Sequence, residues 1–138
     1  WWSLLIIRDA MMGARRFKHF QENLGIAKNT LTSRLNDLIE GGIIKKVPAD
    51  DGSAYDEYRL TDRGRDLSPV IIALAQWGDK WVAHEEGPST VRTDKETGER
   101  LSRVWPRREA GDLVELHEIG MRRANGAPPK VWHQEKED

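Results

Sequence analysis

The chain contains no cysteine among its 138 residues. This absence excludes disulfide bonds, thiolate catalysis, thiol redox sensing and cysteine-ligated zinc within these residues. Long hydrophobic runs are also missing. No apolar stretch approaches the roughly 20 residues that a membrane-spanning helix needs, and no signal peptide is visible. We therefore expect a cytoplasmic protein with no membrane partner.

An excess of charge of one sign is missing too, because the formal net charge is −1. At face value, a nearly neutral chain argues against a protein that binds nucleic acid. The charges are unevenly spread, however: residues 8–46 hold eight basic residues against four acidic ones, a local net charge of +4. A chain that is almost neutral overall can therefore carry a basic face.

Patterns typical of enzymes are scarce. The four histidines are scattered and lack the H-x-x-x-H or H-E-x-x-H spacing of metal sites. There is no Gly-rich phosphate loop, G-x-S-x-G elbow or Walker motif. We therefore expect no enzymatic activity, no metal and no cofactor.

What the chain does have is a run of short amphipathic segments that end at glycines. Apolar spacing predicts three helices, which end at Gly13, Gly25 and Gly41-Gly42. In the third, leucines from Leu31 to Leu38 form one apolar stripe. Beyond it, two short strands around the polar residues 48–53 predict a β-hairpin. This order, mainly α with a small β part, is that of a winged helix-turn-helix.

Thr61 is placed as the N-cap of a long fourth helix, which Pro69 should kink or restart near its beginning. Apolar residues then recur at alternating spacings of three and four, as in a coiled-coil seam. These residues are Leu67, Val70, Leu74, Trp77 and Trp81. Two tryptophans are more apolar area than a lone surface helix normally exposes, so we predict a dimer interface, with packing inside the chain as the alternative.

We divide the chain into three parts. Residues 1–84 form a DNA-binding and dimerisation domain, and residues 85–124 form a small β-rich appendage with turns at Thr97-Gly98 and Ala110-Gly111. Residues 125–138, with two adjacent prolines and mixed charge, form a disordered tail.

The side of the third helix opposite its leucines predicts contacts to DNA bases. It carries short polar side chains that can donate and accept hydrogen bonds at base edges. They are Lys28, Asn29, Thr32, Ser33 and Asn36. The alternative is the solvated face of an ordinary helical bundle, which the hairpin directly after the helix disfavours.

Basic side chains nearby predict contacts to DNA phosphates. Arg15, Arg16 and Lys18 cluster at the start of the second helix, where cations oppose the helix dipole and so do not serve helix stability. The alternative role for this cluster is solubility. Further candidates are Arg34, Lys45 and Lys46.

The hairpin tip is acidic, at Asp50, Asp51, Asp56 and Glu57. These carboxylates would repel phosphates within a Debye length of roughly 8 Å. The hairpin therefore contacts DNA weakly or contacts something else. A protein–protein adaptor that binds its partner through this hairpin and the appendage is the alternative function.

Several segments agree in order and spacing with one protein family. They are WSLLIIRD at 2–9, GARRF at 13–17, LGIAKN at 24–29, EYRLT at 57–61 and WGD at 77–79. In these segments, the chain resembles the HxlR family of bacterial winged helix-turn-helix transcription regulators. The resemblance covers residues 1 to about 84.

The resemblance implies a homodimer that is joined through the first and last helices, including Leu4, and that binds a pseudo-palindromic site on double-stranded DNA. The third helix would enter the major groove, and Arg15 and Arg16 would flank phosphates. Members of the family regulate stress and small-molecule detoxification genes. A regulator usually needs a small-molecule pocket or a reactive residue to switch its DNA affinity, so an effector of unidentified chemistry is among the expected partners.

The chain departs from the family pattern in three ways. Family members usually have a cysteine and a further helical segment ahead of the tryptophan that begins this sequence, so a thiol switch is not assigned here. The arginine that usually precedes the Glu-Tyr pair of the hairpin aligns with about Tyr55, which bears on insertion into the minor groove. Some relatives carry paired cysteines before glycine in a zinc-knuckle-like segment, and the corresponding positions here are the two glycine turns of the appendage. We therefore expect the appendage to fold as a metal-free pair of hairpins.

Overall fold

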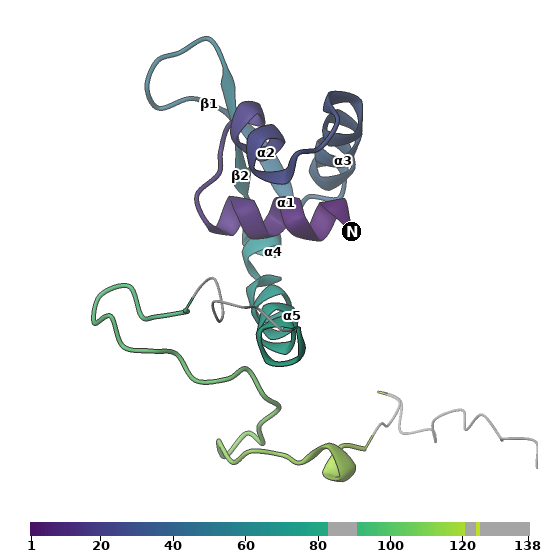
Figure 1. Cartoon of the computed structure of the whole chain (residues 1–138), viewed down its shortest axis with the longest axis vertical. Coiled ribbons are helices and arrows are strands. Elements are labelled where there is room, and N and C mark those ends of the chain that lie inside the picture. The colour runs from purple at the N-terminus through teal and green to yellow at the C-terminus, as the bar shows by residue number, and fades with distance from the viewer. Residues whose placement is uncertain (83–90, 121–123, 125–138) are drawn as a thin grey trace, which may run out of the picture. The chain divides into compact units, whose positions relative to one another are not determined.

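The computed structural model describes residues 1–82, 91–120 and 124. The chain forms two compact units, residues 1–104 and 105–138, which are described separately. Figure 1 traces the order of the elements along the chain. The division at residue 84 stays a prediction, and the predicted disordered tail lies outside the described residues.

Three helices open the first unit: α1 (Trp2–Met11), α2 (Phe17–Leu24) and α3 (Lys28–Glu40). The prediction that these helices end at glycines is confirmed. Gly25 ends α2 in the left-handed conformation at φ +60°. After α3, Gly42 has φ +66°, and the Ile43 N–H donates to the Leu38 carbonyl at 2.9 Å. This Schellman-type end turns the chain directly into the hairpin.

The predicted hairpin is confirmed as strands β1 (Ile44–Pro48) and β2 (Asp56–Leu60). They pair antiparallel, in a register that runs from Ile44 opposite Leu60 to Pro48 opposite Asp56. The loop before α2 is bound to the sheet, because the Tyr58 N–H donates to the Arg15 carbonyl at 2.8 Å. We call this hairpin, residues 44–60, the wing, and the hydrogen bond fixes it to the loop between α1 and α2.

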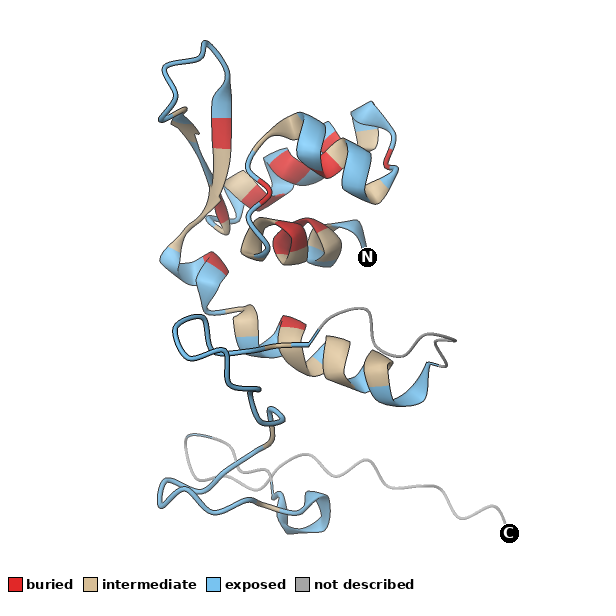
Figure 2. Cartoon of the chain, turned by 60° about the vertical axis from the view of Figure 1, so that its left-hand side comes forward, coloured by how far each residue is buried: buried red, intermediate tan, exposed pale blue. Residues whose placement is uncertain are grey.

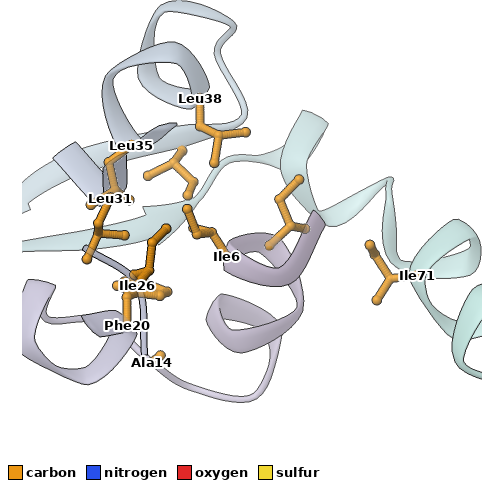
Figure 3. Packing of buried hydrophobic residues seen from close by; sticks show 10 residues of the cluster. Ile6, Ala14, Phe20, Ile26, Leu31, Leu35, Leu38 and Ile71 are labelled. Carbon is orange, nitrogen blue, oxygen red and sulfur yellow. The ribbon is translucent and has the colours of Figure 1, made fainter. Parts of the chain in front are cut away.

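The hydrophobic core lies among these helices and the base of the hairpin (Figure 3). Its fully buried large side chains are Phe20, Ile6, Leu31, Leu35 and Ile44. The leucine stripe of α3 is therefore confirmed as its core face. Phe20 also meets Tyr58 of β2 edge to face, with ring centroids 6.2 Å apart, a geometry that aromatic pairs favour.

The predicted fourth helix is divided as Pro69 indicated. The short α4 (Asp62–Arg65) begins at Thr61, whose hydroxyl accepts from the Gly64 N–H at 3.1 Å and donates to the Gly42 carbonyl at 2.6 Å. A new helix, α5 (Ser68–Trp81), starts with Pro69 in its first turn. Pro is tolerated there because first-turn N–H groups have no partner within a helix.

Gly64 allows α4 to approach the hairpin closely. A Cβ atom built on this glycine would lie 2.2 Å from the Ile43 carbonyl oxygen. Only a residue without a side chain fits between these two backbones.

The appendage has turns at the two predicted glycines, with φ +72° at Gly98 and +98° at Gly111. Each turn is closed by a single β-bridge, Thr93 with Arg100 in the first unit and Arg107 with Leu113 in the second. A 3₁₀ turn, η1 (Leu116–Glu118), follows. The described part of the appendage therefore has bridged turns where the sequence predicts short strands. None of the described helices is long and apolar enough to cross a membrane.

Candidate nucleic-acid interface

The polar face of α3 is open to solvent. All five side chains predicted to read bases, from Lys28 to Asn36, are exposed, while Leu31, Leu35 and Leu38 are buried on the other side (Figure 2). The Thr32 hydroxyl donates to the Lys28 carbonyl at 2.9 Å, so its oxygen remains able to accept a hydrogen bond. This face can present donors and acceptors to a DNA groove.

The basic residues predicted to touch phosphates divide into two groups. Lys18 and Lys45 are exposed, as are Arg15 and Arg34. Lys18 lies 3.5 Å from Glu22, and Arg34 lies 2.9 Å from Asp37, both on the same helix as their partner. Such exposed pairs are weak, so these cations can exchange their partners for phosphates.

Arg16 belongs to the other group, because its guanidinium is bound to the hairpin. One Nη atom donates to the Tyr55 carbonyl at 2.7 Å, and the other contacts the Asp51 carboxylate at 2.8 Å. Glu57 lies 3.7 Å away. Only 20% of the Arg16 side chain is exposed. Arg16 thus ties the wing to the start of α2.

The acids of the wing all have basic partners. Asp50 contacts Arg59, Asp56 lies 3.1 Å from Lys46, and Glu57 lies 2.9 Å from Arg59. Together with Arg15 and Arg16, the hairpin holds five basic residues against four acidic ones, a net charge of +1. The repulsion of phosphates that the acidic sequence predicts is therefore largely compensated within the wing itself.

Hydrogen bonds and ion pairs shift the pKa values of three groups on the wing. The pKa of Asp51 is lowered, mainly because the Ser53 N–H donates to its carboxylate, with Arg16 adding to the effect. The hydrogen bond to Asp56 raises the pKa of Lys46, and those to Asp50 and Glu57 raise the pKa of Arg59. In each case the charged form is favoured, so the wing keeps its ion pairs at neutral pH.

A cavity of about 750 Å³ lies between the start of α2 and the wing. Its lining includes basic and aromatic side chains, which are Arg16, Lys18, Lys46, Phe17, Tyr55 and Tyr58. Tyr55 is 78% exposed. The hollow is therefore a concave, partly basic surface beside the wing.

The helix α5 exposes the predicted seam. Ile71 is its one buried residue and belongs to the core, whereas the side chains from Val70 to Trp81 along the seam are between 51% and 64% exposed. Leu67 precedes α5 and packs, half-buried, against the core of its own unit. On α1, Trp2 and Leu4 are also exposed. The outward apolar stripe therefore begins at Val70.

Comparison with known families decides what this arrangement is. The model of the HxlR-like helix-turn-helix family matches residues 1–86. The chain belongs to this family. The matched residues include α1 to α5 with the hairpin, so the HxlR domain holds both the polar face of α3 and the apolar face of α5.

Relatives of the HxlR domain are named as HTH-type transcriptional regulators. The HTH-type transcriptional regulator Rv3095 of Mycobacterium tuberculosis is 48% identical over 87 residues, 63% of this chain and 55% of that protein. The HTH-type regulator sll1512 of Synechocystis is 38% identical over 93 residues, 67% of this chain and 69% of that protein. The chain spans about half the length of the mycobacterial relatives that it matches.

Solved structures agree with the fold. The crystal structure of PA1607, described as a candidate transcription factor, has a TM-score of 0.81 at 38% identity and covers 89% of this chain and 86% of its own. The reduced form of the regulator YodB from Bacillus subtilis has a TM-score of 0.51 at 30% identity, over 62% of this chain and 83% of its own. These neighbours are named as regulators of transcription and not as enzymes.

Two features of the structure are missed by reasoning from sequence. Arg16 reads as one more cation in a basic cluster, although its partners Asp51 and Glu57 lie 35 and 41 positions away. The second feature is a group of basic side chains against α5, contributed by the segment that follows residue 90. Among the described residues, no group of three or more His, Asp or Glu lies close enough to hold a metal ion.

Proposed function

We propose that the protein is a transcriptional regulator that binds double-stranded DNA as a homodimer. The observation that carries this proposal is the exposed polar face of α3, held by buried leucines beside a tight turn and a hairpin. A helix of about 10–12 Å diameter with such a face fits the major groove. Its membership of the HxlR-like family supports the same reading.

We divide the contacts with DNA by role. Base edges are read by the exposed polar residues of α3, which are Lys28, Asn29, Thr32, Ser33 and Asn36. Phosphates are neutralised by cations that are exposed or weakly paired, which are Arg15, Lys18, Arg34, Lys45 and Lys46. Arg16 acts mainly by holding the wing in place, because its guanidinium already has three partners in the chain.

Dimerisation uses the outward face of α5. The residues Val70, Leu74, Trp77 and Trp81 form its stripe, with Leu4 of α1 as a further candidate. A contiguous apolar stripe with two tryptophans is costly to leave in water, and a second copy offers an identical surface to cover it. A two-fold dimer would place two α3 helices on successive major grooves, about 34 Å apart, on a pseudo-palindromic site.

The test is binding of the purified chain to duplex DNA from the region upstream of its own gene, where many regulators bind. Fluorescence anisotropy at low salt should give saturable binding that weakens steeply as salt rises. Unlabelled duplex of scrambled sequence should compete poorly. Stress and small-molecule detoxification genes are the next targets to screen.

A protein–protein adaptor remains the second candidate and makes the opposite prediction. An adaptor would give no retarded DNA at low salt and no dependence on the α3 side chains. The ion pairs of the wing weigh against it, because Asp50, Asp51 and Asp56 are bound to Arg59, Arg16 and Lys46 instead of facing outward as a free acidic surface.

A further inference from the structure

The hollow between the start of α2 and the wing brings three aromatic side chains together. They are Phe17 of α2 and Tyr55 and Tyr58 of the wing. Phe17 and Tyr58 are half-buried and pack against the core, and Tyr58 also meets Phe20 edge to face. Tyr55, in contrast, is exposed. The hollow therefore has two aromatic groups fixed by the core and one whose ring is open to a ligand.

The basic side chains that line this hollow are already paired with acids. Arg16 contacts Asp51 at 2.8 Å, and Lys46 lies 3.1 Å from Asp56. The third basic side chain, Lys18, is paired with a glutamate of its own helix. An anionic ligand would have to displace the carboxylates from Arg16 and Lys46, whereas an uncharged ligand leaves both pairs intact. The lining therefore favours a ligand without net charge.

We propose that the hollow binds a small, uncharged aromatic molecule, and that this molecule weakens the binding of DNA. The rings of Phe17, Tyr55 and Tyr58 would meet the ring of the ligand in offset or edge-to-face contacts, which aromatic groups favour. Ser53 and His19 also line the hollow and can form hydrogen bonds with a hydroxyl group of the ligand. The volume of about 750 Å³ lies within the range of roughly 300–1,000 Å³ that is usual for small-molecule pockets.

A ligand in this hollow would act on DNA binding because the hollow joins α2 to the wing. Its walls belong to both elements, and Arg16 bridges them by donating to the Tyr55 carbonyl at 2.7 Å. Lys18 and Lys46 line the same hollow and are among the cations that we propose to neutralise phosphates. A molecule between α2 and the wing would move these cations relative to each other. This regulatory part rests on the proposed function, whereas binding of the aromatic molecule does not.

The site is tested on the full chain in the absence of DNA, with 2-naphthol as an uncharged aromatic probe. Its fluorescence is excited where the chain does not absorb, and we expect saturable binding of one molecule per chain. Naphthalene-2-sulfonate has the same rings with a negative charge and should bind more weakly. Decahydro-2-naphthol has a similar size without aromatic rings and should compete poorly. Tighter binding of the sulfonate would overturn the assignment of an uncharged ligand, and equal competition by the saturated alcohol would overturn the role of the aromatic rings.

Substitutions of the aromatic side chains locate the site. Tyr55→Ala should weaken binding of 2-naphthol at least about fivefold, since an aromatic contact is lost. Arg16 is bound to the backbone carbonyl of Tyr55 and so keeps this partner in the variant. Tyr55→Phe keeps the ring and should retain affinity, and Phe17→Leu keeps an apolar contact with the core but should weaken binding. Trp1→Ala removes an exposed ring outside the hollow and should leave affinity unchanged. Full binding by both Tyr55→Ala and Phe17→Leu would overturn the proposed site.

The effect on DNA is measured by fluorescence anisotropy of the labelled duplex from upstream of the gene, with and without saturating 2-naphthol. We expect the affinity for DNA to fall at least about fivefold, and saturating DNA to weaken 2-naphthol binding by the same factor, because coupling between two sites is reciprocal. Unchanged DNA affinity with the probe bound would overturn the regulatory part. A chain that binds no DNA would refute the proposed function and the regulatory part together, and the probe would still decide the site. Intact DNA binding without saturable probe binding would refute this inference alone.

Discussion

The helices α3 and α5 carry similar apolar stripes, but the stripe of α3 is buried in the core and the stripe of α5 is exposed. In α3, Leu31, Leu35 and Leu38 are buried and the polar face is exposed. In α5, Ile71 alone is buried, and the residues of the stripe, including Trp77 and Trp81, are exposed. Periodicity therefore reveals a stripe but not whether the same chain or another molecule covers it.

The largest expected effect is on folding and comes from the stripe of α3. Leu35→Ala should lower the free energy of unfolding by roughly 2–5 kcal/mol, because it leaves a cavity among fully buried side chains. Urea denaturation measures this change. Ser33→Ala, on the exposed face of the same helix, should change stability by no more than about 0.5 kcal/mol. If both substitutions changed the free energy of unfolding equally, α3 would not have one buried and one exposed face.

The stripe of α5 should instead control assembly. Trp77→Ala with Trp81→Ala should give a monomer in light scattering at concentrations where the unchanged chain is a dimer, and the helical circular dichroism should persist. Gln76→Ala, which lies outside the stripe on α5, is the control and should leave the dimer intact. A dimer that survives loss of both tryptophans would refute the proposed seam.

The exposed face of α3 should determine which DNA sequence is bound. Asn29→Ala should weaken binding to the preferred site by roughly 1–3 kcal/mol if its amide reads a base edge. Binding to scrambled duplex should hardly change, so specificity falls. Fluorescence anisotropy with both duplexes measures the ratio of the two affinities. Asn23→Ala, on the exposed side of α2, is the matched control and should leave this ratio unchanged. Uniform weakening on all duplexes would assign Asn29 to the backbone instead.

Local rules predict most of this fold correctly. The glycine ends of α2 and α3, the leucine face, the hairpin and the break near Pro69 each depend on residues that are close in sequence. The close approach of Gly64 to Ile43 does not, because it depends on how α4 packs against the hairpin. The same holds for the group of basic side chains against α5, which comes from α5 and from residues beyond 90.

The role of charged residues is harder to predict than that of apolar ones. The period of a helix assigns every leucine to a face, whereas a cation such as Arg16 has its role fixed by partners far along the chain. The acidic sequence of the wing likewise predicts repulsion of DNA. The ion pairs of Asp50, Asp51 and Asp56 change this expectation, and no local pattern contains them.

Arg15 and Arg16 are neighbours in sequence, but their substitution should have different effects, since Arg15 is proposed to contact phosphate and Arg16 to hold the wing. Arg15→Ala should reduce the slope of log K against log salt by about one, as expected for a lost phosphate contact. Arg16→Ala should leave the slope nearly unchanged and instead speed amide hydrogen exchange in the hairpin, because the tether to Tyr55 and Asp51 is gone. Equal slopes for both variants would show that Arg16 also meets phosphate.

The smallest expected effect is a pH dependence confined to the wing. The pKa of Asp51 is lowered in the folded chain, mainly by the hydrogen bonds from Ser53 and to a smaller extent by Arg16. These contacts therefore contribute stability above the ordinary value of 3.8 and lose it as pH falls through the lowered value. Hydrogen exchange at the hairpin tip should therefore stay constant from neutral pH to about 5, after correction for intrinsic rates, and rise only below 3.8. Asp51→Asn should show the faster exchange at every pH. A rise near neutral pH in the unchanged chain would mean that another group holds the wing.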